Sequence, residues 1–67
     1  FAPGTKVTLI DDVLATGGTL EAAISLIADA GGIITSIIVL LEISELNGRQ
    51  RIEQAAPTVP LHSLVKV

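Results

Sequence analysis

The sequence predicts an α/β fold, namely a fragment of a doubly wound parallel sheet in the order strand, helix, strand, short helix, strand. Apolar residues make up 49% of the chain, yet Phe1 is the only aromatic one, so the core must be aliphatic. Runs rich in Val, Ile and Leu alternate with a segment of helical periodicity. Aliphatic strands separated by helices are typical of parallel sheets, whose strands are buried on both faces.

The first strand and the first helix are marked by a change in hydrophobic period. Residues 6–10 (KVTLI) predict a buried strand that ends at Asp11. We expect residues 11–18 to form a loop, because an acidic pair is followed there by Thr-Gly-Gly. From Thr19 onwards the apolar residues follow helical spacing, and Gly31-Gly32 is a signal for the helix end. The apolar stripe consists of Leu20, Ala23, Ile24, Ile27 and Ala28.

The second half of the chain predicts two more strands around a short helix. Residues 33–41 are rich in β-branched residues, and the helical crossover before them implies that this strand pairs in parallel with the first. A short helix is expected to begin at Asn47 or Gly48, with Ile52 facing the core, and residues 61–67 are expected to form the last strand. The polar residues of the short helix are expected to face outward: Arg49, Arg51, Glu53 and Gln54.

Composition excludes several classes of protein. The chain has no cysteine, and its one histidine cannot by itself form a zinc site. Its net charge is −3 with only four basic residues, so nucleic-acid binding has little electrostatic support. The apolar run at residues 37–41 is far shorter than the roughly 20 residues that a membrane helix needs, and no signal-peptide pattern is present. We therefore expect a soluble, cytoplasmic protein without a membrane or nucleic-acid partner.

Chain length limits what the sequence can form alone. Sixty-seven residues are one domain at most, and short chains without disulfides or metals are marginally stable. A parallel sheet needs helices on both faces, whereas this chain has material for about two. We expect a fragment of a larger α/β domain, or a chain whose core is covered by a partner.

The segment that carries chemistry is the glycine-rich loop between the first strand and the first helix. Ligands of open α/β sheets bind at the carboxyl ends of strands, and free backbone N–H groups at a helix start attract anions. Gly17 and Gly18 allow the backbone to approach a phosphate closely, and the hydroxyls of Thr16 and Thr19 add hydrogen bonds. The loop therefore predicts a site for one phosphate.

The acidic pair before the loop predicts what carries that phosphate. Asp11 and Asp12 would repel a second phosphate, but carboxylates accept hydrogen bonds from sugar hydroxyls and recruit Mg²⁺ through water. A ligand with vicinal hydroxyls beside one phosphate fits this pattern, and ribose 5-phosphate has that shape.

Two familiar phosphate motifs do not match, and a third pattern does. A P-loop requires a lysine near the glycines and a dinucleotide fingerprint requires GxGxxG, and neither is present. Residues 7–19 (VTLIDDVLATGGT) closely resemble the signature of type I phosphoribosyltransferases, in which a hydrophobic strand and two acidic residues precede a T-G-G-T loop. Ala15 stands where the hypoxanthine–guanine members and the ribose-phosphate pyrophosphokinases have an aspartate. The variant is similar to adenine phosphoribosyltransferases, and the resemblance continues at residues 41–42, 46–49 and 60–64.

This resemblance implies roles for individual residues. Asp11 and Asp12 would contact the ribose hydroxyls of phosphoribosyl pyrophosphate. The residues that would hold its 5′-phosphate are Ala15, Thr16, Gly17, Gly18 and Thr19. Val13 and Leu14 would lie near the purine. The implied reaction joins adenine to the ribose and releases pyrophosphate, giving AMP for purine salvage, with Mg²⁺ accompanying the pyrophosphate substrate and no direct metal ligand on the chain. The resemblance singles out no catalytic residue.

The resemblance also implies what the chain lacks. The family's pyrophosphate loop, lid loop and purine hood precede the signature, so residues 1–67 are expected to be the C-terminal portion of one phosphoribosyltransferase domain and to be inactive alone. The whole protein is expected to be a homodimer. An alternative function is a non-catalytic regulator that senses phosphoribosyl pyrophosphate with the same fold, although the acidic net charge is unfavourable for a repressor. A pyrophosphokinase, disfavoured by Ala15, and a fragment with a disordered site also remain open.

Other polar residues have simpler interpretations. A response-regulator receiver also has an early acidic pair, but its phospho-accepting aspartate is replaced here by Glu42. We expect Glu42 and Glu45 to be solvated or paired with Arg49 at the strand end. His62 is expected to be structural, and Arg49 and Arg51 are expected to decorate an exposed helix or to reach a dimer partner.

Overall fold

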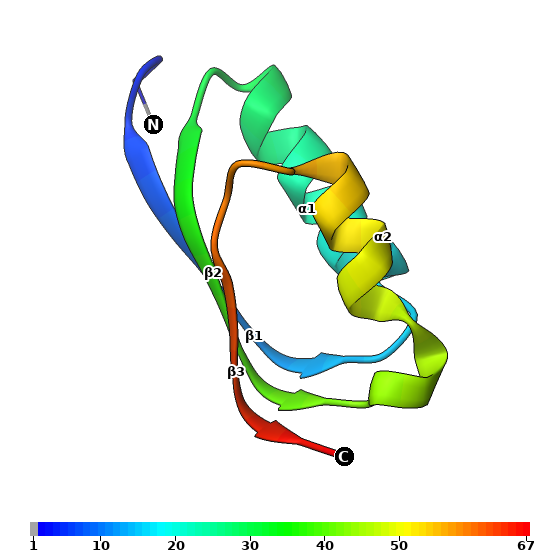
Figure 1. The fold of residues 1–67 in the computed structure, drawn as a ribbon. Helices are drawn as coiled ribbons and strands as arrows, with labels where there is room; N and C mark the ends of the chain where they lie inside the picture. Colours follow the sequence, from blue (N-terminus) through cyan, green and yellow to red (C-terminus); the bar gives the residue numbers. More distant parts are fainter. Residues whose placement is uncertain (1) are drawn as a thin grey trace.

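The chain folds into a parallel three-stranded sheet with two helices packed on it (Figure 1). The structure is a computed structural model that describes residues 2–67. Its sheet has the order β1-β2-β3, and both pairs of neighbouring strands are parallel. Along the chain the elements are β1 (Lys6–Leu14), α1 (Gly18–Asp29), β2 (Ile33–Glu42), the 3₁₀ turn η1 (Ser44–Leu46), α2 (Gly48–Ala55) and β3 (Leu61–Lys66). The predicted α/β class and element order are confirmed.

Both helices lie on the same face of the sheet, so that the carboxyl ends of the strands curve beneath them (Figure 1). The strand order follows the chain order, and successive crossovers of one hand place their helices on one side. A doubly wound sheet also has helices on the other face, and residues 2–67 supply none there. The expectation that further chain or a partner covers this sheet stays a prediction.

The register between β1 and β2 contains one irregularity. Val7 pairs with Ile34 but Thr8 pairs with Ser36, which leaves Thr35 as an extra residue in β2. The Thr35 hydroxyl donates to the carbonyl oxygen of Val7 at 3.2 Å. Thr35 and Ser36 interrupt the aliphatic run of β2 at this point, where the extra residue forms the bulge.

The core is a single aliphatic layer between the sheet and the helices. Its most deeply buried side chains are Leu14, Ile37, Val39 and Ile52, each at most 1% exposed. Leu20 and Ile24 of α1 are also buried, as the apolar stripe predicts, and Ile52 is the inward residue of α2. The absence of aromatic side chains from this layer agrees with the composition.

Strand β1 is longer than the sequence indicates. The prediction that the strand ends at Asp11 and that a loop follows is wrong, because β1 continues to Leu14 and remains paired there with Glu42 of β2. The carboxylates within the strand accept hydrogen bonds from the next backbone N–H: Asp12 N–H donates to Asp11 at 2.8 Å, and Val13 N–H donates to Asp12 at 2.9 Å. The loop is therefore confined to residues 15–17.

The sheet face away from the helices carries exposed aliphatic side chains. Ile10 is 66% exposed, Leu40 50% and Leu64 69%. Strand alternation places Leu40 on the face opposite Ile37 and Val39 of β2, and it places Leu64 on the face opposite Leu61 of β3. In β1, Ile10 alternates with Leu9, which packs against the core. In the described residues, no helix is both long and apolar enough to cross a lipid bilayer.

Candidate functional site

The glycine loop joins the end of β1 to the start of α1 and leaves the first turn of the helix open. Gly17 has a φ of 89°, a left-handed conformation that a side chain would strain, and it occupies the N-cap position without a side-chain cap. The Glu21 N–H bonds to the Gly17 carbonyl oxygen at 2.8 Å. The N–H groups of residues 18–20 precede it and belong to the turn that has no carbonyl partner within a helix. Thr16 and Thr19 are exposed beside them. The arrangement can bind an anion.

The start of helix α2 packs against this loop. A Cβ on Gly48 would overlap the carbonyl oxygen of Ala15 and would lie 2.8 Å from Leu14 Cδ1. A Cβ on Gly17 would in turn lie 3.1 Å from the Gly48 carbonyl oxygen. The glycine at the start of α2 thus allows the two backbones to touch, so the position of α2 fixes the shape of the loop. Sequence reasoning missed this role, since Gly48 reads only as a helix-start signal.

The acidic pair lies on consecutive positions of β1, and four residues separate it from the first glycine of the loop. Consecutive strand residues point to opposite sides, and Asp11 is partly buried whereas Asp12 is exposed. Val13 is 41% exposed, but Leu14 is buried in the core. Of the two residues predicted to lie near a purine, only Val13 therefore has an accessible side chain.

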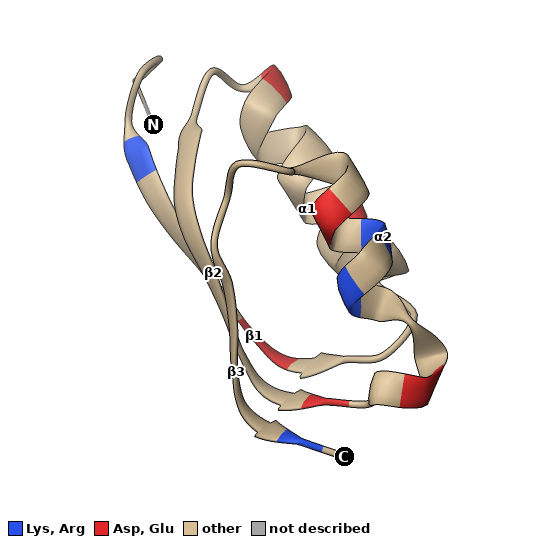
Figure 2. Ribbon diagram, in the orientation of Figure 1, with Lys and Arg blue, Asp and Glu red and all other residues tan. Residues whose placement is uncertain are grey.

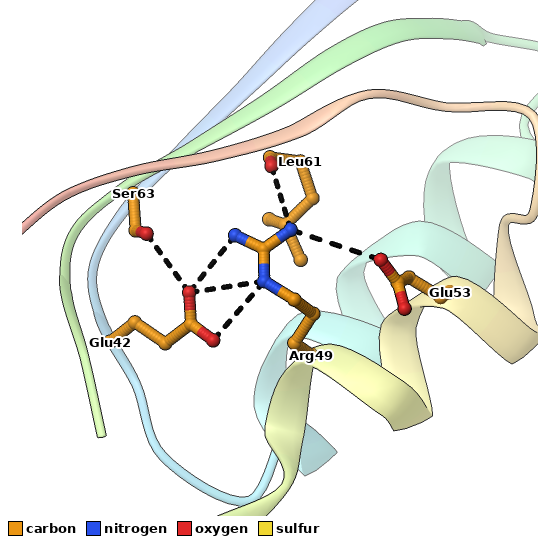
Figure 3. A network of polar contacts seen from close by, with 5 residues as sticks. All are labelled: Glu42, Arg49, Glu53, Leu61 and Ser63. Atoms are coloured by element: carbon orange, nitrogen blue, oxygen red, sulfur yellow. Dashed lines mark hydrogen bonds and ion pairs between the residues drawn. The ribbon is translucent and has the colours of Figure 1, made fainter. Parts of the chain in front are cut away.

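A charged network joins α2 to the ends of β2 and β3 (Figure 3). Glu42 is 3% exposed, and its carboxylate accepts hydrogen bonds from the Arg49 guanidinium at 2.9 to 3.2 Å and from the Ser63 hydroxyl at 2.9 Å. Arg49 Nη1 also donates to the Leu61 carbonyl oxygen at 2.9 Å, and it lies 3.8 Å from Glu53. The expected pairing of Glu42 with Arg49 is confirmed. The expectation that Arg49 faces outward is wrong, because this buried carboxylate requires a partner.

This network lowers the pKa of Glu42 below its ordinary value of 4.5, chiefly through the hydrogen bonds from Arg49, and burial opposes the shift only in part. The pKa of Arg49 is raised by the same hydrogen bonds. Because the pKa of Glu42 is lower in the folded state, the pair stabilises the fold above the ordinary carboxylate pKa, and this contribution is lost as the pH falls through the folded-state pKa. At neutral pH the network is ionised and holds α2 against the sheet.

A second ion pair lies beside the loop. Arg51 Nη2 is 3.1 Å from Glu21 Oε1 and links α2 to the first turn of α1. Sequence reasoning missed this pair, because the two residues are 30 positions apart. Figure 2 shows the resulting charge pattern, with acidic residues at the carboxyl ends of β1 and β2 and basic residues on α2.

The remaining candidates take no part in this arrangement. His62 is exposed on β3, where it pairs in register with Ile38, and Glu45 is exposed in η1. Within residues 2–67 no pocket is enclosed and no three His, Cys, Asp or Glu side chains gather to hold a metal ion. On this part of the chain the loop is an open surface.

Comparison with known proteins gives a consistent result. A family model described as the phosphoribosyl transferase domain matches residues 2–60. The chain is 48% identical over 67 residues to an adenine phosphoribosyltransferase of Streptomyces galbus, of which it covers 37%. It is 57% identical over 52 residues to that of Clavibacter michiganensis, where the match covers 78% of this chain and 30% of the relative.

Solved structures give the same picture. The adenine phosphoribosyltransferase of Thermoanaerobacter pseudethanolicus superposes with a TM-score of 0.89 at 39% identity, covering 100% of this chain and 38% of that one. The enzyme of Trypanosoma brucei, in complex with AMP, pyrophosphate and ribose-5-phosphate, gives a TM-score of 0.87 at 34% identity, covering 98% of this chain and 30% of that one. The chain thus spans about a third of the length of the relatives that it matches.

Proposed function

The chain belongs to the phosphoribosyl transferase domain family, and from this premise we propose that its glycine loop binds the 5′-phosphate of a phosphoribosyl compound. The observation that carries the proposal is the open first turn of α1, which begins at a left-handed Gly17 and has no side-chain cap. In this proposal the backbone N–H groups of residues 17–19 and the hydroxyls of Thr16 and Thr19 donate to the phosphate oxygens. The helix dipole adds a favourable interaction with the negative charge.

The ribose is assigned to the acidic end of β1. Asp11 and Asp12 lie near the carboxyl end of β1, two residues before the loop, so a sugar attached to the bound phosphate can extend toward their carboxylates. Carboxylates accept hydrogen bonds from the ribose hydroxyls, and such bonds to a charged acceptor are stronger than bonds between neutral groups. The two side chains leave opposite sides of β1, so we assign the closer contact to one of them and a contact through water or Mg²⁺ to the other.

We further propose that the whole protein is an adenine phosphoribosyltransferase, as its relatives are named. In that reaction N9 of adenine forms a bond to C1′ of the ribose while the bond from C1′ to pyrophosphate breaks. Pyrophosphate leaves with the electron pair, and the ring N–H proton of adenine is released to solvent. The residues of this chain hold the ribose phosphate in place for that displacement, which is a contribution of orientation. We propose that Mg²⁺ accompanies the pyrophosphate part of the substrate.

The described residues contain no basic group placed to hold pyrophosphate beside the ribose site, because the cations of α2 are paired with Glu42 and Glu21. We therefore propose that these 67 residues bind ribose phosphate without catalysing AMP formation. An AMP-forming rate well above background from the pure chain would contradict this part of the proposal.

The test is calorimetric titration of the chain with ribose 5-phosphate, AMP and adenosine. We expect the two phosphorylated ligands to bind and adenosine, which lacks the phosphate, to bind much more weakly. Gly18→Val adds methyl groups beside the first helical N–H and should abolish binding of both. Ser25→Val, at an exposed position of the same helix, is the matched control and should bind as the wild type does. Equal affinity for AMP and adenosine would contradict a phosphate site.

A further inference from the structure

The ion pair between Arg51 and Glu21 lies against the glycine loop. Arg51 Nη2 is 3.1 Å from Glu21 Oε1, and Arg51 Nη1 is 3.5 Å from the point that a Cβ on Gly18 would occupy. Its Cδ is 3.4 Å from the corresponding point on Gly17. The arginine side chain therefore runs along both glycines of the loop and ends at the first turn of α1.

Glu21 creates an electrostatic conflict at this position. A carboxylate in the first turn of a helix interacts favourably with the helix dipole when no ligand is present. The same carboxylate places a negative charge in the turn where a phosphate dianion would bind, and the two negative charges would repel each other. Asp11 and Asp12 at the end of β1 add negative charge at the same edge of the sheet. An unpaired Glu21 would therefore oppose the binding of a phosphate.

Arg51 is the cation that the described residues place on Glu21. The other arginine of α2, Arg49, is occupied by Glu42 and Glu53 on the opposite side of the helix. The side chains of Arg51 and Glu21 are 47% and 38% exposed, and an ion pair so exposed contributes little to stability. Because its contribution to folding is this small, the pair can be removed without unfolding the chain.

We propose that Arg51 is a charge-neutralising positioning residue of the phosphate loop, which pairs with Glu21 and so removes the repulsion between that carboxylate and a bound phosphate. The proposal rests on the proposed function, because it requires that the loop binds a phosphate. It assigns to Arg51 an effect on ligand affinity that acts through Glu21 rather than through a contact with the ligand. The effect of removing Arg51 therefore depends on whether Glu21 is present.

The experiment is a double-mutant cycle with ribose 5-phosphate as the probe, measured by calorimetry on the chain at low ionic strength. Arg51→Gln is expected to weaken binding by about 5- to 10-fold, the size expected for one uncompensated charge at a short distance in a largely aqueous setting. Glu21→Gln alone should bind at least as tightly as the wild type. The double variant should regain the wild-type affinity to within about twofold, because without the Glu21 charge there is no repulsion for Arg51 to neutralise. The double-mutant cycle measures this dependence of one residue on the other.

Two controls separate charge from structure. Lys6→Gln removes the same positive charge at the opposite end of β1, and it should leave the affinity unchanged (Figure 2). Raising the salt concentration to about 0.5 M should shrink the defect of Arg51→Gln relative to the wild type, because surface charges are then screened. All variants should unfold at the wild-type temperature to within a few degrees, as exposed ion pairs contribute little.

The outcomes distinguish this proposal from the one on which it rests. Wild-type affinity in Arg51→Gln would overturn the charge-neutralising role while leaving the phosphate site intact. A double variant as weak as Arg51→Gln would also overturn it, and would indicate that Arg51 contacts the ligand directly. Failure of the folded wild type to bind ribose 5-phosphate would refute the proposed function itself, and the role of Arg51 would fall with it.

Discussion

Replacement of Gly48 by alanine tests whether α2 shapes the phosphate loop. The added methyl would overlap the Ala15 carbonyl oxygen and would lie 2.8 Å from Leu14 Cδ1, whereas carbon atoms in contact are normally about 3.5 to 4.0 Å apart. Either α2 or the loop must move. Overpacking of this kind lowers the free energy of unfolding by about 1 to 3 kcal/mol, and the better helix propensity of alanine offsets at most about 1 kcal/mol of that loss. We expect a net loss of about 1 to 2 kcal/mol.

The assay is urea unfolding followed by circular dichroism, combined with titration of ribose 5-phosphate. For a domain of this size each kcal/mol corresponds to about 4 to 8 °C in Tm, so thermal unfolding should show the same loss. Gly18→Ala is the matched control, because its new Cβ would meet Arg51 at an ordinary 3.5 Å and should leave stability unchanged or slightly higher. We also expect Gly48→Ala to weaken ribose 5-phosphate binding. A Gly48→Ala chain as stable as the wild type would refute the reasoning.

Three further predictions concern the core and the buried charge. Glu42→Gln removes the buried carboxylate that pairs with Arg49, and should lower the free energy of unfolding, measured in urea, by about 3 kcal/mol. An unchanged urea midpoint would show that the ion pair makes no net contribution to stability. Because the pKa of Glu42 is lowered, wild-type stability should fall as the pH drops below about 4.5, and Glu42→Gln should show a smaller fall over the same range. Ile52→Ala should cost about 2 to 5 kcal/mol by leaving a cavity, whereas Gln54→Ala on the exposed face should cost almost nothing.

Local sequence patterns predicted the elements of the fold and the place of the loop. The period of Leu20 and Ile24 identified the buried face of α1, and Ile52 was the only large apolar residue in α2. The strand, the glycines and the helix start stand next to one another in the chain, so their juxtaposition requires no tertiary information. For this reason the glycine loop could be located from residues 7–19 alone.

The supports of the site could not be predicted in the same way, because they depend on contacts between distant segments. The extension of β1 to Leu14 follows from its pairing with Glu42, which outweighs the turn preference of the acidic pair. Arg49 turns inward only because the end of β2 presents a buried carboxylate to it. The packing of Gly48 beneath the loop likewise requires the placement of α2, which the polarity of its sequence does not reveal.

The central claim is that the loop at the start of α1 binds the phosphate of a ribose phosphate, and a ¹⁵N NMR titration of the chain tests it most directly. The amides of Gly17, Gly18 and Thr19 are expected to shift and saturate with ribose 5-phosphate, and to remain in place with ribose. Amides at the opposite end of the sheet, such as that of Gly32 just before β2, serve as internal controls. A well-dispersed spectrum in which the loop amides do not respond to ribose 5-phosphate, or respond equally to ribose, would contradict the claim.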